Sequence, residues 1–254
     1  MTKTPDDFVF FWKPDGSNGW AGQWHPSPFT ARVALPPSQG NGDVEAAEGE
    51  ERDVYFPTAE HWMMAQKALL FGDREIFERV VGLPSSSFTS TSTSSGDTPS
   101  AAGPGPTRST RSRPSKATAP TTPKGTRSLP SPKEVKALGR KVKNFDDETW
   151  VRERTRIVLE GSLHKFRQNA NLRRELLATG EKELVEASPL DGIWGIGMGE
   201  KKGRETCGSD ALGRQGWGLN LLGKALVQAR AILREEFKDE AEGQVANGGD
   251  EETS

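Results

Sequence analysis

The sequence has few of the features that mark secreted or membrane proteins. It contains one cysteine, Cys207, so a disulfide within the chain is excluded and a reducing compartment is expected. No apolar run approaches the ~20 residues of a membrane-spanning helix, and the opening "MTKTPDDFVFFW" lacks a signal-peptide run. The formal net charge of −2 argues against a general nucleic-acid binder. We therefore expect a soluble cytoplasmic or nuclear protein.

Apolar residues are also scarce. They make up 33% of the chain and the mean hydropathy is −0.69, which indicates that part of the chain is disordered. The stretch 84–131 consists largely of Ser, Thr, Pro, Gly and Ala, so burial cannot offset the entropy lost on ordering it. We predict a disordered insertion there, a shorter acidic one at 36–52, and a disordered acidic tail at 239–254. The long insertion is either a solvated linker or a phosphorylated or partner-binding tract, and its composition does not separate the two.

Two folded segments remain, 8–83 and 132–238, and each is expected to form half of one domain. Aromatic and β-branched runs predict strands at 8–12, 27–35, 53–56 and 183–189. Helical spacing and capping residues predict helices at 56–71, 73–81, 132–143, 146–169, 171–180 and 220–237. Strands come early and helices dominate later. The fold class is therefore α+β, a single compact and mostly helical domain with a small sheet, interrupted by the long insertion.

Common catalytic and metal-binding motifs are missing. There is no Walker loop, no H-E-x-x-H and no nucleophile elbow, and the glycines of "WGIGMG" (194–199) do not have G-x-G-x-x-G spacing. The histidines His25, His61 and His164 are not spaced as metal ligands. We expect neither a metal nor a cofactor.

The predicted helix "FPTAEHWMMAQKALLF" carries an acid and an amine on nearly one face. Glu60 and Lys67 lie seven residues apart, which is two helical turns. One interpretation is a reaction site. The other is that Glu60 is favoured by the helix dipole in the first turn, while the Lys67 side chain extends to solvent.

Three further stretches offer candidate binding residues. Asp191 and Trp194 lie in a glycine-rich loop after a predicted strand, where backbone N–H groups can approach a phosphate or sugar closely. Asn220 begins the last predicted helix, whose free N–H groups favour an anion. Trp20 and Trp24 are available to stack on a base. The alternatives are that Asn220 is only an N-cap, that Trp194 is core, and that Gly195 and Gly197 only form turns.

Four stretches appear in an order that resembles the NADAR family, also called YbiA-like or riboflavin-biosynthesis-intermediate N-glycosidases. They are "PTAEHWMMAQKALLFGD", "LGRKVKNFDDETWVRERTRIV", "KFRQNANLRRELLATGEKELVEASPLDGIWGIGM" and "WGLNLLGKALVQAR". The resemblance implies one compact α+β domain that cleaves N-glycosidic bonds to ribose. It implies as substrates a phosphoribosylated aminopyrimidine or ADP-ribosylated guanine in nucleic acid. The chain departs from relatives at 21–24, where "AGQW" stands in place of F-S-N-F.

With this resemblance, we interpret Glu60 as general acid/base and Lys67 as the nucleophile of a Schiff-base route. Direct hydrolysis with a purely electrostatic Lys67 remains open. Asp191 is expected to hold ribose hydroxyls, and Asn220 with Gly195 and Gly197 to hold phosphate. The other expected substrate-binding residues are Trp20, Trp24, His61 and Trp194. A non-catalytic module that binds ADP-ribose or NAD and a scaffold for the insertion are the rival interpretations. No protein partner and no membrane association are expected.

Overall fold

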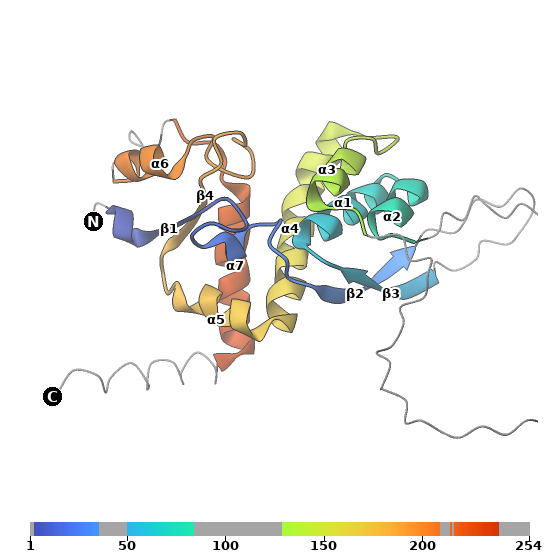
Figure 1. Ribbon diagram of the computed structural model, residues 1–254, viewed down its shortest axis with the longest axis horizontal. Helices are drawn as coiled ribbons and strands as arrows, with labels where there is room; N and C mark the ends of the chain where they lie inside the picture. Colours follow the sequence, from blue (N-terminus) through green and yellow to red (C-terminus); the bar gives the residue numbers. More distant parts are fainter. Residues whose placement is uncertain (1–2, 36–49, 84–128, 209–213, 215, 239–254) are drawn as a thin grey trace, which may run out of the picture.

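The structure, a computed structural model, describes residues 3–35, 50–83, 129–208, 214 and 216–238. Two long helices, α4 (Asp147–Gln168) and α7 (Leu221–Glu236), pack against each other at its centre (Figure 1). On one side of this pair lie β1 (Phe8–Phe11), β4 (Glu183–Glu186), α5 (Ala170–Ala178) and α6 (Glu200–Thr206). On the other side lie α1 (Ala59–Leu70), α2 (Arg74–Val80), α3 (Pro132–Gly139), β2 (Phe29–Leu35) and β3 (Glu50–Phe56). The short 3-10 helices are Pro5–Asp7 and Gly19–Ala21.

The predicted α+β class is confirmed, and the small sheet consists of two separate pairs of strands. β1 and β4 are parallel, with Phe8 opposite Glu183 and Phe11 opposite Glu186. β2 and β3 are antiparallel, with Phe29 opposite Phe56. In β2 the side chains alternate strictly between buried and exposed, as expected for a strand with one face on the core. The parallel pair places the residues that follow β1 and β4 at one edge.

Local capping chemistry explains several helix starts. The Asp73 carboxylate accepts from the Ile76 N–H at 3.1 Å, and the Asp146 carboxylate accepts from the Thr149 N–H at 2.8 Å. Ser131 and Glu134 form a reciprocal capping box at the start of α3, with Pro132 at its first position. These helices were predicted from the same residues, and the structure confirms them.

Residues 36–49, 84–128 and 239–254, where the insertions and the tail are predicted, lie outside the described residues. The predicted long insertion nevertheless ends too late at 131. Leu129 packs over Gly82, where a Cβ would approach a Leu129 methyl to 2.5 Å. The Pro130 carbonyl accepts a hydrogen bond from His61 Nε2 at 2.8 Å, and Ser131 caps α3. These three residues therefore belong to the folded domain.

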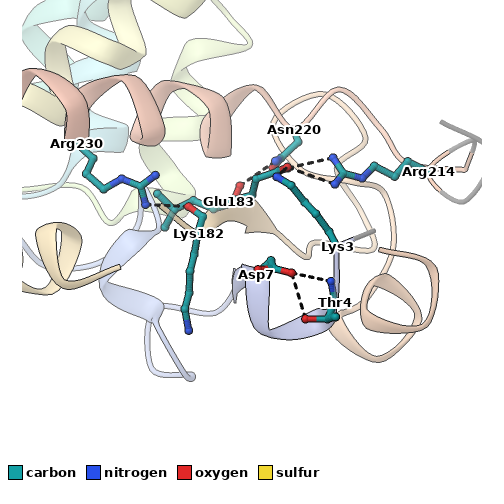
Figure 2. Close-up of polar contacts among 9 residues, drawn as sticks. Lys3, Thr4, Asp7, Lys182, Glu183, Arg214, Asn220 and Arg230 are labelled. Atoms are coloured by element: carbon teal, nitrogen blue, oxygen red, sulfur yellow. Dashed lines mark hydrogen bonds and ion pairs between the residues drawn. The ribbon is translucent and has the colours of Figure 1, made fainter. Parts of the chain in front are cut away.

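The start of β4 is tied down by charged side chains. Figure 2 shows Lys3 and Arg214 converging on the Glu183 carboxylate, and Arg230 donating to the Lys182 carbonyl at 2.8 Å. Arg214 also lies over the Phe8 ring, 5.0 Å from its centroid. These contacts hold β4 against β1 and α7. Within the described ranges, no helix has the length and apolar character needed to cross a membrane.

Candidate active site

A cavity of about 520 Å³ opens at the edge where β1 and β4 end. Its walls come from the segments after these strands, from the loop that precedes β2, and from the adjoining faces of α1 and α3. Its polar lining consists of three carboxylates, two lysines, one amide and one hydroxyl, whereas indole, thioether and aliphatic side chains provide most of the rest. This volume lies within the range of small-molecule sites. The lining residues are Trp12, Lys13, Pro14, Gly22, Gln23, Trp24, Glu60, Met63, Met64, Lys136, Glu186, Ser188, Leu190, Asp191, Ile193 and Trp194.

Glu60 lies in the first turn of α1, and its side chain faces this cavity. The residue is 4% exposed, and its backbone N–H donates to the Gln23 carbonyl at 3.1 Å. Burial raises the pKa of the Glu60 carboxyl from 4.5 to about 7. The Lys136 ammonium and the Trp24 indole, which can donate a hydrogen bond, oppose this rise, while the Asp191 carboxylate adds to it. Glu60 therefore titrates in the range that suits acid–base catalysis.

Glu186, the last residue of β4, is a second cavity acid that the sequence analysis missed. Burial raises the pKa of its carboxyl from 4.5 to about 7, and the neighbouring Asp191 and Glu60 carboxylates add to this rise. Lys136 opposes it. The available signal was an acid inside a predicted strand, just before the "SPLDG" loop. The Glu60 carboxylate is the smallest of these influences on Glu186, and burial is the largest.

Asp191 and Lys136 are two further charged residues of the cavity lining. Asp191 Oδ1 accepts from the N–H groups of Ile193 at 3.0 Å and Trp194 at 2.8 Å, which shapes the loop after β4. Its Oδ2 atom lies 4.0 Å from Lys136 Nζ. Lys136 comes from α3 and was not predicted, because only the fold brings α3 beside α1. The Lys136 ammonium thus attracts three carboxylates, those of Glu60, Glu186 and Asp191.

Three of the buried polar atoms that lack a partner belong to residues of this cavity. In the part of the chain that the structure describes, four buried side-chain atoms have no hydrogen-bond partner: Gln23 Nε2, Glu60 Oε1, Arg154 Nε and Glu186 Oε2. Leaving such atoms unpaired costs roughly 1–3 kcal/mol each. Their concentration at one cavity indicates that a ligand pairs with them. Among the described residues, no group of three or more His, Cys, Asp or Glu has an arrangement suited to a metal ion.

The predicted meeting of Lys67 with Glu60 is wrong. Lys67 is not among the cavity-lining residues, and its Nζ lies 4.1 Å from the Phe145 ring centroid and 5.3 Å from that of Trp150. Burial lowers the pKa of Lys67, and Asp147 opposes this shift. Two helical turns separate the residues along α1 by about 10.5 Å. The aromatic side chains at the start of α4 bind the Lys67 ammonium instead.

The expected phosphate site at Asn220 is also wrong. Asn220 Oδ1 accepts from the Glu186 N–H at 3.1 Å, and its Nδ2 donates to the Leu184 carbonyl at 2.9 Å. Both ends of the amide thus bind the β4 backbone. Gly195 and Gly197 do not line the cavity either. A Cβ at Gly195 would lie 2.5 Å from the Glu186 carbonyl, and Gly197 has a φ of +70°, so both allow the loop to fold tightly.

The remaining predicted binding residues divide into two groups. Trp24 and Trp194 line the cavity as expected. Trp20 instead packs edge-on against Phe166 in the core, with ring centroids 6.1 Å apart. His61 is buried between Thr58 Oγ1 and the Pro130 carbonyl, each 2.8 Å from a ring nitrogen. Because the Pro130 carbonyl can only accept, Nε2 carries the proton and Nδ1 accepts from Thr58. His61 therefore links α1 to the segment before α3.

The fold and the two cavity carboxyl groups with raised pKa values define an α+β protein with a site suited to acid–base catalysis. The chain matches the model of the NADAR domain over residues 10–98 and 116–234, and it belongs to the NADAR family. The resemblance in the sequence is thus confirmed. The unmatched part between these ranges, 99–115, is shorter than the predicted insertion.

Named relatives extend this comparison. The chain is 32% identical over 187 residues to N-glycosidase R617 of Acanthamoeba polyphaga mimivirus, covering 73% of this chain and 79% of that protein. It is 29% identical over 203 residues to Protein irg-1 of Caenorhabditis elegans, covering 78% and 72%. N-glycosidase Npun_R5314 of Nostoc punctiforme is 36% identical over 104 residues, covering 41% and 56%. The two relatives named as N-glycosidases support the assignment of this protein as a hydrolase that acts on N-glycosyl compounds.

A solved structure shows the same fold. The NMR structure of the E. coli protein YbiA matches with a TM-score of 0.51 at 19% identity, covering 93% of this chain and 88% of that one. At this identity the likeness concerns the fold alone.

Proposed function

We propose that this protein is an N-glycosidase that hydrolyses the bond between a ribose and a nitrogen of a base. The observation that supports this most strongly is a pair of glutamates beside one cavity, the buried Glu60 and the half-buried Glu186, whose carboxyl pKa values are both raised to about 7. Near neutral pH such a pair holds about one proton, because two like charges in a buried site oppose each other's ionisation. The names of the relatives support the same class of reaction.

The surroundings of the two acids differ in a way that assigns their roles. Lys136 and Asp191 act on both acids in the same sense, whereas a Trp24 hydrogen bond favours the ionised form of Glu60 alone and the Glu60 carboxylate disfavours ionisation of Glu186. Glu186 therefore keeps the shared proton and acts as the general acid. It protonates the departing nitrogen as the bond from C1 of ribose breaks and its electron pair moves to that nitrogen.

Glu60 then acts as the ionised partner. Its carboxylate stabilises the positive charge that develops on the ribose ring, and it takes a proton from the water that attacks C1. Lys136 keeps Glu60 ionised, and Asp191 holds the loop and can accept from a ribose hydroxyl. Direct hydrolysis of this kind needs no covalent lysine. Of the described lysines, Lys13 and Lys136 line the cavity, whereas Lys67 does not.

The lining also favours a planar leaving group. Trp12, Trp24 and Trp194 provide flat apolar surfaces, and Lys13 provides a positive charge for a phosphate. A phosphoribosylated aminopyrimidine and ADP-ribosylated guanine are the two substrates that we propose, since each joins a ribose to a planar base.

The test is to incubate the purified protein with each compound and to measure the free base and the free sugar. We expect release of both products in equal amounts, and loss of most release in Glu60→Gln and Glu186→Gln. Binding of either compound without any product would contradict the hydrolase and would favour a non-catalytic module that binds ADP-ribose or NAD.

A further inference from the structure

The cavity contains a hydrogen-bond donor that the proposed reaction does not use. Gln23 lies in the loop between the 3-10 helix Gly19–Ala21 and β2, and its side chain lines the cavity. Its Nε2 atom is buried, and no acceptor among the described residues lies within hydrogen-bond distance. An amide N–H without an acceptor is costly to bury, so this atom calls for a ligand atom that accepts.

The loop that presents Gln23 is held from two sides. The Gln23 carbonyl accepts from the Glu60 N–H at 3.1 Å, which fixes the loop relative to Glu60. In addition, Lys165 Nζ, from α4, donates to the carbonyls of Trp20 at 2.6 Å and Gly22 at 3.0 Å. The backbone on both sides of Gln23 is therefore fixed before a ligand arrives.

Lys165 is an unusual residue to hold a loop, because a lysine is rarely buried without an acidic partner. It is 2% exposed, and both of its oxygen partners are neutral carbonyls of this loop. Burying a lysine costs free energy that its hydrogen bonds must offset. Here the hydrogen bonds of Lys165 fix the loop that forms one wall of the cavity, so the buried charge stabilises the shape of the binding site.

The partner of Gln23 follows from the chemistry of the other unpaired atoms. Glu60 Oε1 is an acceptor, and a ribose hydroxyl can donate to it, while the protonated Glu186 serves the nitrogen bonded to the ribose. Gln23 Nε2 is a donor, and it stands next to Trp24, whose exposed indole offers a surface for a planar ring. An acceptor on that ring, rather than on the sugar, matches the donor.

We propose that Gln23 is a specificity-determining residue whose side-chain amide donates a hydrogen bond to a carbonyl oxygen on the base of the substrate. Lys165 is the positioning residue that holds the Gln23 loop. This inference rests on the proposed function only in placing a ribosylated base in the cavity. The substrate class is thereby narrowed to ribosylated bases that carry a ring carbonyl.

The test compares two nucleosides by calorimetric titration. Inosine carries a ring carbonyl, whereas purine riboside has the same rings and sugar without it. We expect the unsubstituted protein to bind inosine about tenfold more tightly, the effect of one hydrogen bond of about 1.4 kcal/mol. Gln23→Met, which keeps the length of the side chain but has no donor, is expected to bind both nucleosides equally.

A second variant separates donation from acceptance by the amide. Inosine also carries a ring N–H that purine riboside lacks, and a Gln23 oxygen could accept from it. Gln23→Glu retains an acceptor and loses the donor, so the preference for inosine should disappear. A preference that survives in Gln23→Glu, or in Gln23→Met, would overturn the proposal, as would binding of neither nucleoside.

Lys165→Met tests the positioning role. This variant should lose the preference for inosine while thermal unfolding stays cooperative, since the buried stem of the side chain is kept. An unchanged preference would overturn the role of Lys165. These titrations do not require turnover. Absence of hydrolysis with a Gln23-dependent preference would overturn only the proposed function, and hydrolysis without that preference would overturn only this inference.

Discussion

Glu183 and Glu186 are the first and last residues of β4, and their carboxyl groups have opposite surroundings. Glu183 binds Lys3 and Arg214, and these partners outweigh burial and lower the pKa of its carboxyl (Figure 2). Glu186 is half-buried near two other carboxylates, and the pKa of its carboxyl is raised to about 7. One strand thus carries an acid paired with cations at its start and an acid near other carboxylates at its end.

The difference separates an acid that supports the fold from one that is available for chemistry. A carboxylate paired with cations is held in one charge state and contributes to stability. A carboxyl group that is buried without a partner weakens the fold, and it is useful only if a ligand or a proton transfer requires it. The Asn220 amide binds the β4 backbone at Leu184 and Glu186, so it fixes the strand that carries both acids.

The largest expected effect comes from neutralising each acid in turn. Glu186→Gln removes the general acid, so we expect kcat to fall by about 10²–10⁴. Glu183→Gln removes two partly exposed ion pairs, each typically worth about 0–1 kcal/mol of stability, and should leave kcat nearly unchanged. Steady-state kinetics and thermal unfolding of both variants measure the contrast. Equal losses of kcat would show that Glu186 acts through the fold and not through the proton.

The lysines of α1 and α3 offer a second comparison of the same kind. Lys136→Met removes the charge that favours ionised Glu60, and we expect kcat/KM to fall, because a higher pKa leaves less of the Glu60 carboxyl ionised at neutral pH. Lys67→Met removes only a contact with aromatic rings, so activity should stay close to that of the unsubstituted chain.

Borohydride added during turnover provides an independent readout, because it traps a Schiff base on a lysine. Direct hydrolysis predicts no sugar adduct in the mass spectrum. An adduct on Lys67, together with loss of activity in Lys67→Met, would restore the covalent route through that residue.

Stability should depend on pH in opposite directions for the two ends of β4. The folded-state pKa of Glu186 is raised from 4.5 to about 7, so its contribution is fully present below 4.5 and is lost as the pH rises through 7. Glu183 has a lowered folded-state pKa, so its contribution is present above 4.5 and is lost on acidification.

Thermal unfolding at pH 5 and pH 8 gives the smallest but most specific effect. Glu186→Gln should raise the melting temperature more at pH 8 than at pH 5, because only the ionised carboxylate is costly. Glu183→Gln should not show this gain at pH 8. Parallel shifts of both variants at the two pH values would contradict the assignment of the raised pKa to Glu186.

The sequence predicts the features that depend on local chemistry. Asp73, Ser131 and Asp146 cap helices because an oxygen accepts from an N–H three residues later, and this spacing is visible in the sequence. Glu60 was predicted as a site residue from its helix and from the family resemblance. Its location at the cavity agrees with that expectation, while its role stays a proposal.

The rest of the site depends on contacts between distant segments. Glu186 becomes a cavity residue because β1 and β4 pair in parallel, and Lys136 because α3 packs beside α1. No local pattern shows either. The wrong predictions for Lys67 and Asn220 have the same origin. The Lys67 ammonium lies over the rings of Phe145 and Trp150, and the Asn220 amide hydrogen-bonds to the β4 backbone.

A carboxyl-carbon NMR titration with ¹³C-labelled glutamate tests the central claim most directly. The account predicts two glutamate resonances that titrate near pH 7 as a coupled pair, with one of them lost in Glu60→Gln and the other in Glu186→Gln. Glu183, assigned through Glu183→Gln, should titrate below its ordinary value. If the glutamates at positions 60 and 186 both titrate near 4.5, the cavity holds no proton at neutral pH and the proposed acid–base pair is wrong.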